Sequence, residues 1–151
     1  MSRSLFADAT LAIRLETADA QSNVAYVCAK QQVYPASNSA WTPIGDGCAV
    51  FTGLHSPINR VHGLGMTRIV TGDEVAAAAE FFHSRGRLPA IDLCPLAHPS
   101  LVELLRTHGY TIASFKQVLV LALDHDRALP APNPAVTVDR VEPVDLNTEM
   151  Q

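Results

Sequence analysis

The 151-residue sequence is poor in lysine and in long apolar runs, and each shortage excludes a class of protein. Lys30 and Lys116 are its only lysines, no basic run occurs, and the net charge is −4. Surfaces that bind nucleic acids or anionic membranes need clustered positive charge, which this chain lacks. No apolar run approaches the ~20 residues that a membrane-spanning helix needs. We therefore predict neither a nucleic-acid partner nor a membrane partner.

Cysteine is also scarce, which bears on the compartment. Cys28, Cys48 and Cys94 are odd in number, widely spaced and without a CxxC pattern, as expected of buried thiols in a reducing environment. The N-terminal stretch SLFADATLAI is interrupted by Asp8 and followed by Arg14, which argues against a secretory signal. The prediction is a cytoplasmic protein.

The composition is that of an ordinary folded chain. Apolar residues make up 48% and charged residues 17%, and the length is enough for one domain with a full core. Three alternating prolines predict an extended linker over residues 128–135. We therefore expect a domain over 1–127, and an extra strand or the start of a second, missing domain over 136–151.

Periodicity and turn residues predict the order of elements within that domain. The expected elements are a helical region over 5–32, a loop over 35–43, strands over 48–52 and 60–66, a helix from Thr71 or Asp73 to about 84, a strand over 91–96, a helix beginning near Pro99, and a long strand over 110–123. Thr17–Asp19 leaves open whether the first region is one helix or two. The apolar run from Val118 to Leu123 is typical of a central strand buried on both faces. The predicted class is α/β (α+β), with a mixed, mostly antiparallel sheet flanked by helices.

The stretch HPSLVELLRTHGY, which begins at His98, carries a family resemblance. It resembles the N-P-x-A-x-x-L-Y-x-x-x-G-F motif of the GNAT-type N-acetyltransferase superfamily, with Pro99, Leu104, Gly109 and Tyr110 at the matching positions. The wider run LCPLAHPSLVELLRTHGY resembles the degenerate N-terminal half of two-domain members. In those proteins a second domain carries the acetyl-CoA loop.

The resemblance implies that this chain lacks the catalytic acid and that a second domain binds acetyl-CoA. In the family a tyrosine four residues before the glycine protonates the departing CoA thiolate, and Leu105 stands at that position here without a proton to give. We therefore expect the non-catalytic or substrate-side half of an N-acetyltransferase, with acetyl-CoA bound by a second GNAT-like domain or within a homo-oligomer. The alternatives are a self-sufficient acetyl-CoA-dependent N-acetyltransferase, and a small-molecule or protein binding module that keeps the fold without the chemistry.

The run RVHGLG contains the candidate cofactor-binding residues Arg60, Gly63 and Gly65. It fits R-x-x-G-x-G, the pattern by which the family holds the CoA pyrophosphate on free amides at a helix N-terminus. Such a loop requires a helix directly after its second glycine, whereas here a helix cap first occurs at Thr71. The favoured interpretation is structural, with both glycines marking a strand bulge or close packing.

Trp41 and His62 are the candidate substrate-pocket residues. The resemblance places the loop after the first helices, which contains Trp41, beside the acceptor groove, and His62 is expected on a strand that can face a cleft. The favoured alternatives are a tryptophan that caps the edge of the core and a structural histidine. Asp92 is expected in a strand, facing either water or a pocket. The six histidines show no H-x-x-x-H or H-E-x-x-H spacing, so no metal site is predicted.

Overall fold

The computed structural model describes residues 8–121, 131 and 133–137. They fall into two compact units, Met1–Leu119 and Val120–Gln151, which we describe separately. In the second unit a turn forms at Asn133, whose backbone oxygen accepts from the Val136 amide at 3.0 Å. The strand or second domain predicted over 136–151 lies, apart from residues 136 and 137, outside the described residues.

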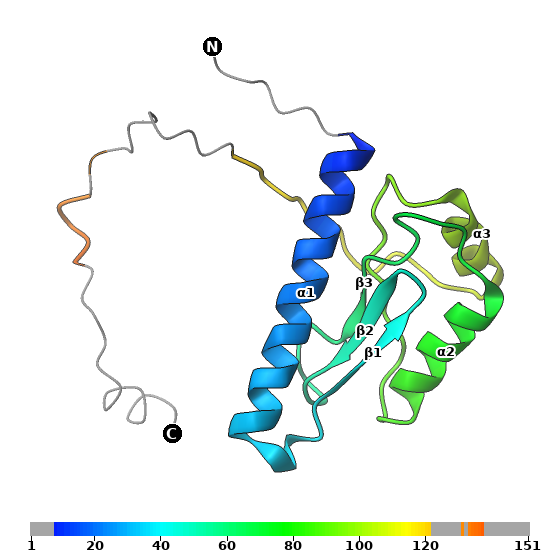
Figure 1. Ribbon diagram of the computed structural model, residues 1–151, viewed down its shortest axis with the longest axis horizontal. Coiled ribbons are helices and arrows are strands. Elements are labelled where there is room, and N and C mark those ends of the chain that lie inside the picture. Colours follow the sequence, from blue (N-terminus) through cyan, green and yellow to red (C-terminus); the bar gives the residue numbers. More distant parts are fainter. Residues whose placement is uncertain (1–7, 122–130, 132, 138–151) are drawn as a thin grey trace. The chain divides into compact units, whose positions relative to one another are not determined.

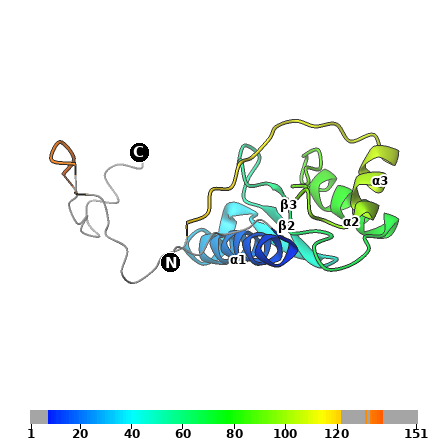
Figure 2. The same cartoon turned by 90° about the horizontal axis from the view of Figure 1, so that it is seen from above.

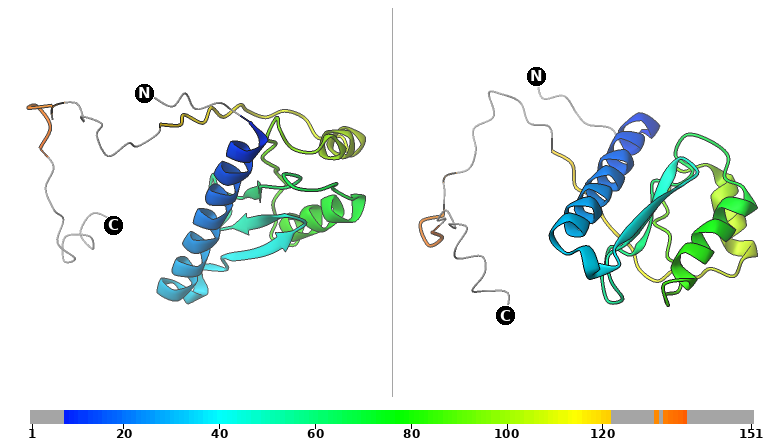
Figure 3. Two further views of the ribbon diagram at one scale, coloured as in Figure 1. Left: turned by 45° about the horizontal axis from the view of Figure 1, so that its top comes forward. Right: turned by 60° about the horizontal axis from the view of Figure 1, so that its bottom comes forward.

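The first unit is a small α+β structure, which confirms the predicted class (Figure 1). Its elements are α1 (Ala9–Val33), the 3₁₀ turn η1 (Pro35–Ser37), β1 (Ala40–Ile44), β2 (Gly47–Phe51), β3 (Arg60–His62), α2 (Gly72–His83) and α3 (Pro99–Thr107). The strands form one antiparallel sheet in the order β1-β2-β3. The sheet lies between α1 on one face and the pair α2 and α3 on the other (Figures 2 and 3). Among the described residues, none of the helices has the length and apolar character needed to cross a membrane.

Helix α1 is one uninterrupted helix, which answers the question that Thr17–Asp19 left open. Its N-cap is Asp8, whose carboxylate accepts from the Leu11 amide at 2.8 Å and so satisfies one of the free amides of the first turn. Only a narrow stripe of the helix is buried. At its centre Val27 packs against Cys48 and Val50 of β2 and fixes the helix on that face of the sheet.

The prediction of a loop over 35–43 is wrong for its C-terminal part, because β1 begins at Ala40. Trp41 pairs with Val50 and Ile44 with Gly47, around a tight turn at Gly45–Asp46. Pro43 had suggested a loop, but proline is tolerated on an edge strand, where its missing N–H breaks no ladder. β1 is such an edge strand.

The main core lies on the opposite face, where β2 meets α2 and α3. Phe82 and Leu101 are fully buried beside Phe51, and the rings of Phe81 and Phe82 meet edge to face at 5.1 Å. Helix α2 is held at its start by a capping box between Thr71 and Glu74, so that Thr71 is the cap of the two predicted candidates, Thr71 and Asp73.

Two strands are shorter in the structure than the sequence predicted. β3 ends at His62 instead of continuing to Met66, because the chain turns at Gly63. The strand predicted over 91–96 is reduced to a single parallel bridge between Ile91 and Val61, and Pro95 follows, which cannot donate to a ladder.

The long central strand predicted over 110–123 is also wrong for the residues that the structure describes. Residues 111–121 form no strand, and all of them are exposed. Within the described part of the chain, their amides and carbonyls have no backbone hydrogen-bond partner. The apolar run has strand-like composition but no described neighbour to pair with, so its composition alone does not make a strand.

Candidate functional site

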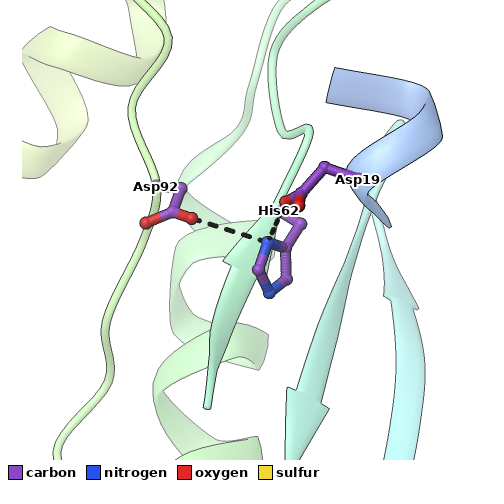
Figure 4. Close-up of side chains that lie close together, drawn as sticks. All are labelled: Asp19, His62 and Asp92. Atoms are coloured by element: carbon purple, nitrogen blue, oxygen red, sulfur yellow. Dashed lines mark hydrogen bonds and ion pairs between the residues drawn. The ribbon is translucent and has the colours of Figure 1, made fainter. Parts of the chain in front are cut away.

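Three polar side chains from distant parts of the sequence meet beside the end of β3 (Figure 4). They are Asp19 of α1, His62 of β3 and Asp92 of the segment that follows the Ile91 bridge. Nδ1 of His62 lies 2.9 Å from Oδ2 of Asp19 and 3.5 Å from Oδ2 of Asp92. One potential ligand atom from each residue lies within 4.8 Å of the other two. We call these residues the Asp–His–Asp cluster.

The backbone explains why these side chains converge. Val61 accepts from the Asp92 amide at 2.9 Å and donates to the Ala90 carbonyl at 2.8 Å, which sets the parallel register. In that register the next residues of the two segments, His62 and Asp92, project to the same face. This is the face that α1 covers, and α1 brings Asp19 to the imidazole.

The imidazole of His62 is held from both sides and is 2% exposed. Its Nε2 lies 3.3 Å from the carbonyl oxygen of Ile58. A carbonyl oxygen can only accept, so Nε2 carries the hydrogen of that bond. Nδ1 therefore faces the two carboxylates.

Charged groups of both signs surround the cluster. Asp92 receives Nη1 of Arg60 on Oδ1 at 3.0 Å and Nζ of Lys116 on Oδ2 at 2.5 Å. Glu16 lies one turn before Asp19 on α1, and its pKa is raised by burial and by the negative charges of Asp19 and Asp92. The site is thus a partly buried network of carboxylates that two cations partly neutralise.

The predicted cofactor loop lies directly after β3. Gly63 and Gly65 have φ angles of 69° and 77°, in the left-handed region that favours glycine. The amide of Gly65 donates to Oδ1 of Asp46 at 2.7 Å. The amide and hydroxyl of Thr67 donate to Oδ2 of the same residue at 2.6 and 2.9 Å. The loop does hold an anion, and that anion is a carboxylate of its own chain.

The titration of Asp46 reflects this arrangement. Partial burial opposes ionisation, but the hydrogen bonds from Thr67 and Gly65 outweigh it and lower the pKa of the carboxyl below its ordinary value. No helix begins at Gly65, because α2 starts only at Gly72. The loop therefore has neither free amides at these positions nor a helix dipole aimed at a ligand.

The other sequence candidates are not gathered with the loop. Arg60 directs its guanidinium to Asp92 and to the carbonyl of Pro57, not toward the glycines. Trp41 is exposed on edge strand β1, and β2 separates that strand from the one that carries His62. His62 is the one predicted site residue that lies in the Asp–His–Asp cluster.

Sequence reasoning missed Asp19 and left Asp92 undecided. Asp19 was considered only as part of a possible break between two helices, although Glu16 and Asp19 share a helix face at i, i+3 spacing. That pairing of acids was the one local signal, and nothing local linked it to residues 62 and 92.

Neither a protein-family model, nor a curated protein, nor a solved structure matches this chain.

Proposed function

We propose that this chain is the non-catalytic, acceptor-side half of a GNAT-type N-acetyltransferase, acting with a second acetyltransferase-like domain that binds acetyl-CoA. The order of its elements supports this: a helix, antiparallel strands, a helix, the extended Ile91 bridge and a further helix, as the sequence predicted up to residue 109. The stretch that carries the resemblance forms α3, with Pro99 in its first turn and Gly109 at a φ of 73° just beyond its end.

The main observation behind the proposal is that the carboxylate of Asp46 already accepts the hydrogen bonds of the RVHGLG loop and of Thr67 directly after it. A pyrophosphate would have to displace a carboxylate that three donors already hold within 2.9 Å. Two negatively charged groups competing for the same amides repel each other, so the charge of Asp46 also opposes the ligand. On this account the chain alone binds acetyl-CoA weakly or not at all.

The position of the family tyrosine supports the same conclusion. Leu105 is buried in the core of the first unit, beside Leu101 on α3. Its side chain contributes packing and cannot donate a proton. On this account the chain supplies neither free amides for the CoA pyrophosphate nor the acid of the reaction.

An exposed apolar segment supports the need for a partner. Phe115 is 88% exposed and Leu119 is 93% exposed, and both lie in the stretch 111–119, which is exposed throughout. Contiguous exposed apolar side chains typically mark an interaction surface. A second acetyltransferase-like domain, or another copy of this chain, is the partner that we assign to it.

The three free cysteines support a reducing compartment, and we propose the cytoplasm.

Isothermal titration with acetyl-CoA tests the proposal. We expect no saturable heat in the micromolar range for the chain alone. Micromolar affinity would contradict the proposal and favour a self-sufficient enzyme. Mass spectrometry of a panel of small amines incubated with the chain and acetyl-CoA then distinguishes a non-catalytic half from a self-sufficient enzyme. We expect no acetylated product, and acetylated product would establish catalysis by this chain.

A further inference from the structure

We propose that Asp19, His62 and Asp92 form a binding site for a divalent transition-metal ion, which competes with the ammonium group of Lys116. The proposal is independent of the acetyltransferase assignment, because its three ligands are different residues from Asp46, Gly65 and Thr67, on which that assignment depends. Three elements that are distant in the sequence supply one donor atom each.

The hydrogen bonds of His62 point to a cation. Its Nε2 donates to the Ile58 carbonyl, so a neutral imidazole presents the lone pair of Nδ1 to the carboxylates of Asp19 and Asp92. All three facing atoms are then acceptors, and acceptors at 2.9 and 3.5 Å repel one another. A proton on Nδ1 or a metal ion among the three relieves that repulsion. Metal-binding histidines commonly donate their other ring N–H to a carbonyl in this way.

The distances suit a shared ion. Imidazole nitrogen and carboxylate oxygen bind Zn²⁺ at about 2.0–2.2 Å, so two such ligands on one ion lie about 3.0–3.5 Å apart. The separations from Nδ1 to the two carboxylate oxygens are 2.9 and 3.5 Å, and all three donor atoms lie within 4.8 Å of one another. Because the imidazole is buried and hydrogen-bonded at its other nitrogen, that ligand is already oriented.

The donor set indicates the class of ion. One imidazole with two carboxylates suits Zn²⁺, Co²⁺, Mn²⁺ or Fe²⁺, whereas Ca²⁺ and Mg²⁺ prefer oxygen ligands alone. Three protein ligands leave at least one coordination position for water or another small ligand. The ion has a route to the site, because the side chain of Asp19 is 52% exposed.

Lys116 is the competing cation. Its ammonium lies on Oδ2 of Asp92, the same oxygen that faces the imidazole, and its side chain is 51% exposed. Arg60 occupies the other oxygen and can stay there when the ion binds. Removal of Lys116 should therefore strengthen metal binding, whereas removal of a ligand should weaken it.

A cobalt titration of the tag-free full chain tests this site. Visible Co²⁺ absorption reports bound ion, and Zn²⁺ displacement gives the Zn²⁺ affinity. We expect Asp19→Asn to weaken binding at least tenfold, as expected for lost ligation. We expect Lys116→Gln to strengthen it about two- to fivefold, the range expected when an exposed ion pair no longer competes. Glu80→Gln removes an exposed acid of α2 and serves as the matched control, with unchanged affinity.

The variants were chosen so that folding does not decide the result. Asp19 and Lys116 are half exposed, and circular dichroism verifies that each variant keeps its structure. No saturable cobalt spectrum in the wild-type chain would overturn the proposal. Equal affinities of the wild type and Asp19→Asn would also overturn it, because the ion would then bind at other side chains.

Discussion

Replacement of Asp46 tests whether its carboxylate holds the loop after β3 in place, and the loss of stability is the quantity to measure. Asp46 lies in the turn between β1 and β2, and its carboxylate connects that turn to Gly65 and Thr67. Asp46→Ala removes both acceptor oxygens. Asp46→Asn keeps one oxygen and the shape of the side chain but removes the charge.

The magnitude follows from the three hydrogen bonds. A hydrogen bond to a charged group contributes about 1.5–3 kcal/mol, and a buried donor left unsatisfied costs about 1–3 kcal/mol. Thr67 is exposed, so water replaces its two bonds at little cost, whereas Gly65 is buried. We therefore expect Asp46→Ala to lower the free energy of unfolding by about 2 kcal/mol and Asp46→Asn by about half as much.

Urea unfolding at neutral pH measures both values, with Glu80→Gln as the control. Glu80 is an exposed acid in the body of α2, away from the helix N-terminus. Equal losses for Asp46→Asn and Glu80→Gln would refute the reasoning.

The pH dependence gives a second check on Asp46. Its pKa is lower in the folded chain than in the unfolded one, so its ionisation stabilises the fold above the ordinary carboxyl pKa of about 3.9. That contribution is lost as the pH falls from there through the lower folded-state pKa. The wild-type advantage over Asp46→Ala should therefore shrink on acidification, and an advantage that grows toward low pH would contradict the assignment.

Three further outcomes are expected. Phe82→Ala removes a fully buried ring and should lower the free energy of unfolding by about 3–5 kcal/mol, seen as a large drop in melting temperature; a loss under 1 kcal/mol would contradict the packing. Thr71→Ala removes the cap of α2 and should cost about 1 kcal/mol in urea unfolding, while Thr71→Ser should restore most of it. Cys48 has a pKa raised to about 11 by burial and by the charge of Asp19, so iodoacetamide near neutral pH should alkylate it only after unfolding; peptide mass spectrometry that finds it modified in the native chain would refute its burial.

The helices could be predicted because their signals are local. Thr71 and Glu74 cap α2, Pro99 opens α3, and Gly109 takes the left-handed conformation after it. Each signal lies within a few residues of the helix end that it determines. None of them depends on distant contacts.

Strands depend on partners, and here the sequence was less informative. β1 was missed because Pro43 suggested a loop, whereas the position of the strand at the sheet edge makes that proline acceptable. The run around Val118 was predicted as a central strand from composition, but its residues have no described strand beside them. Composition indicates what can pair and does not supply the neighbour.

The site could be predicted only in part, for the same reason. His62 was identified from its place on a strand, but its partners Asp19 and Asp92 approach through packing of α1 and through the Ile91 bridge. The occupant of the glycine loop, Asp46, lies in a preceding turn, and no spacing rule links the two. In both places tertiary contacts decide the chemistry.

The central claim is that the amides of Gly65 and Thr67 are already satisfied by Asp46 and do not receive the phosphates of acetyl-CoA. An amide NMR titration that follows Gly65 and Thr67 while acetyl-CoA is added tests it directly. The account predicts that both resonances stay in place up to millimolar ligand. A saturable shift of both at micromolar ligand would contradict it.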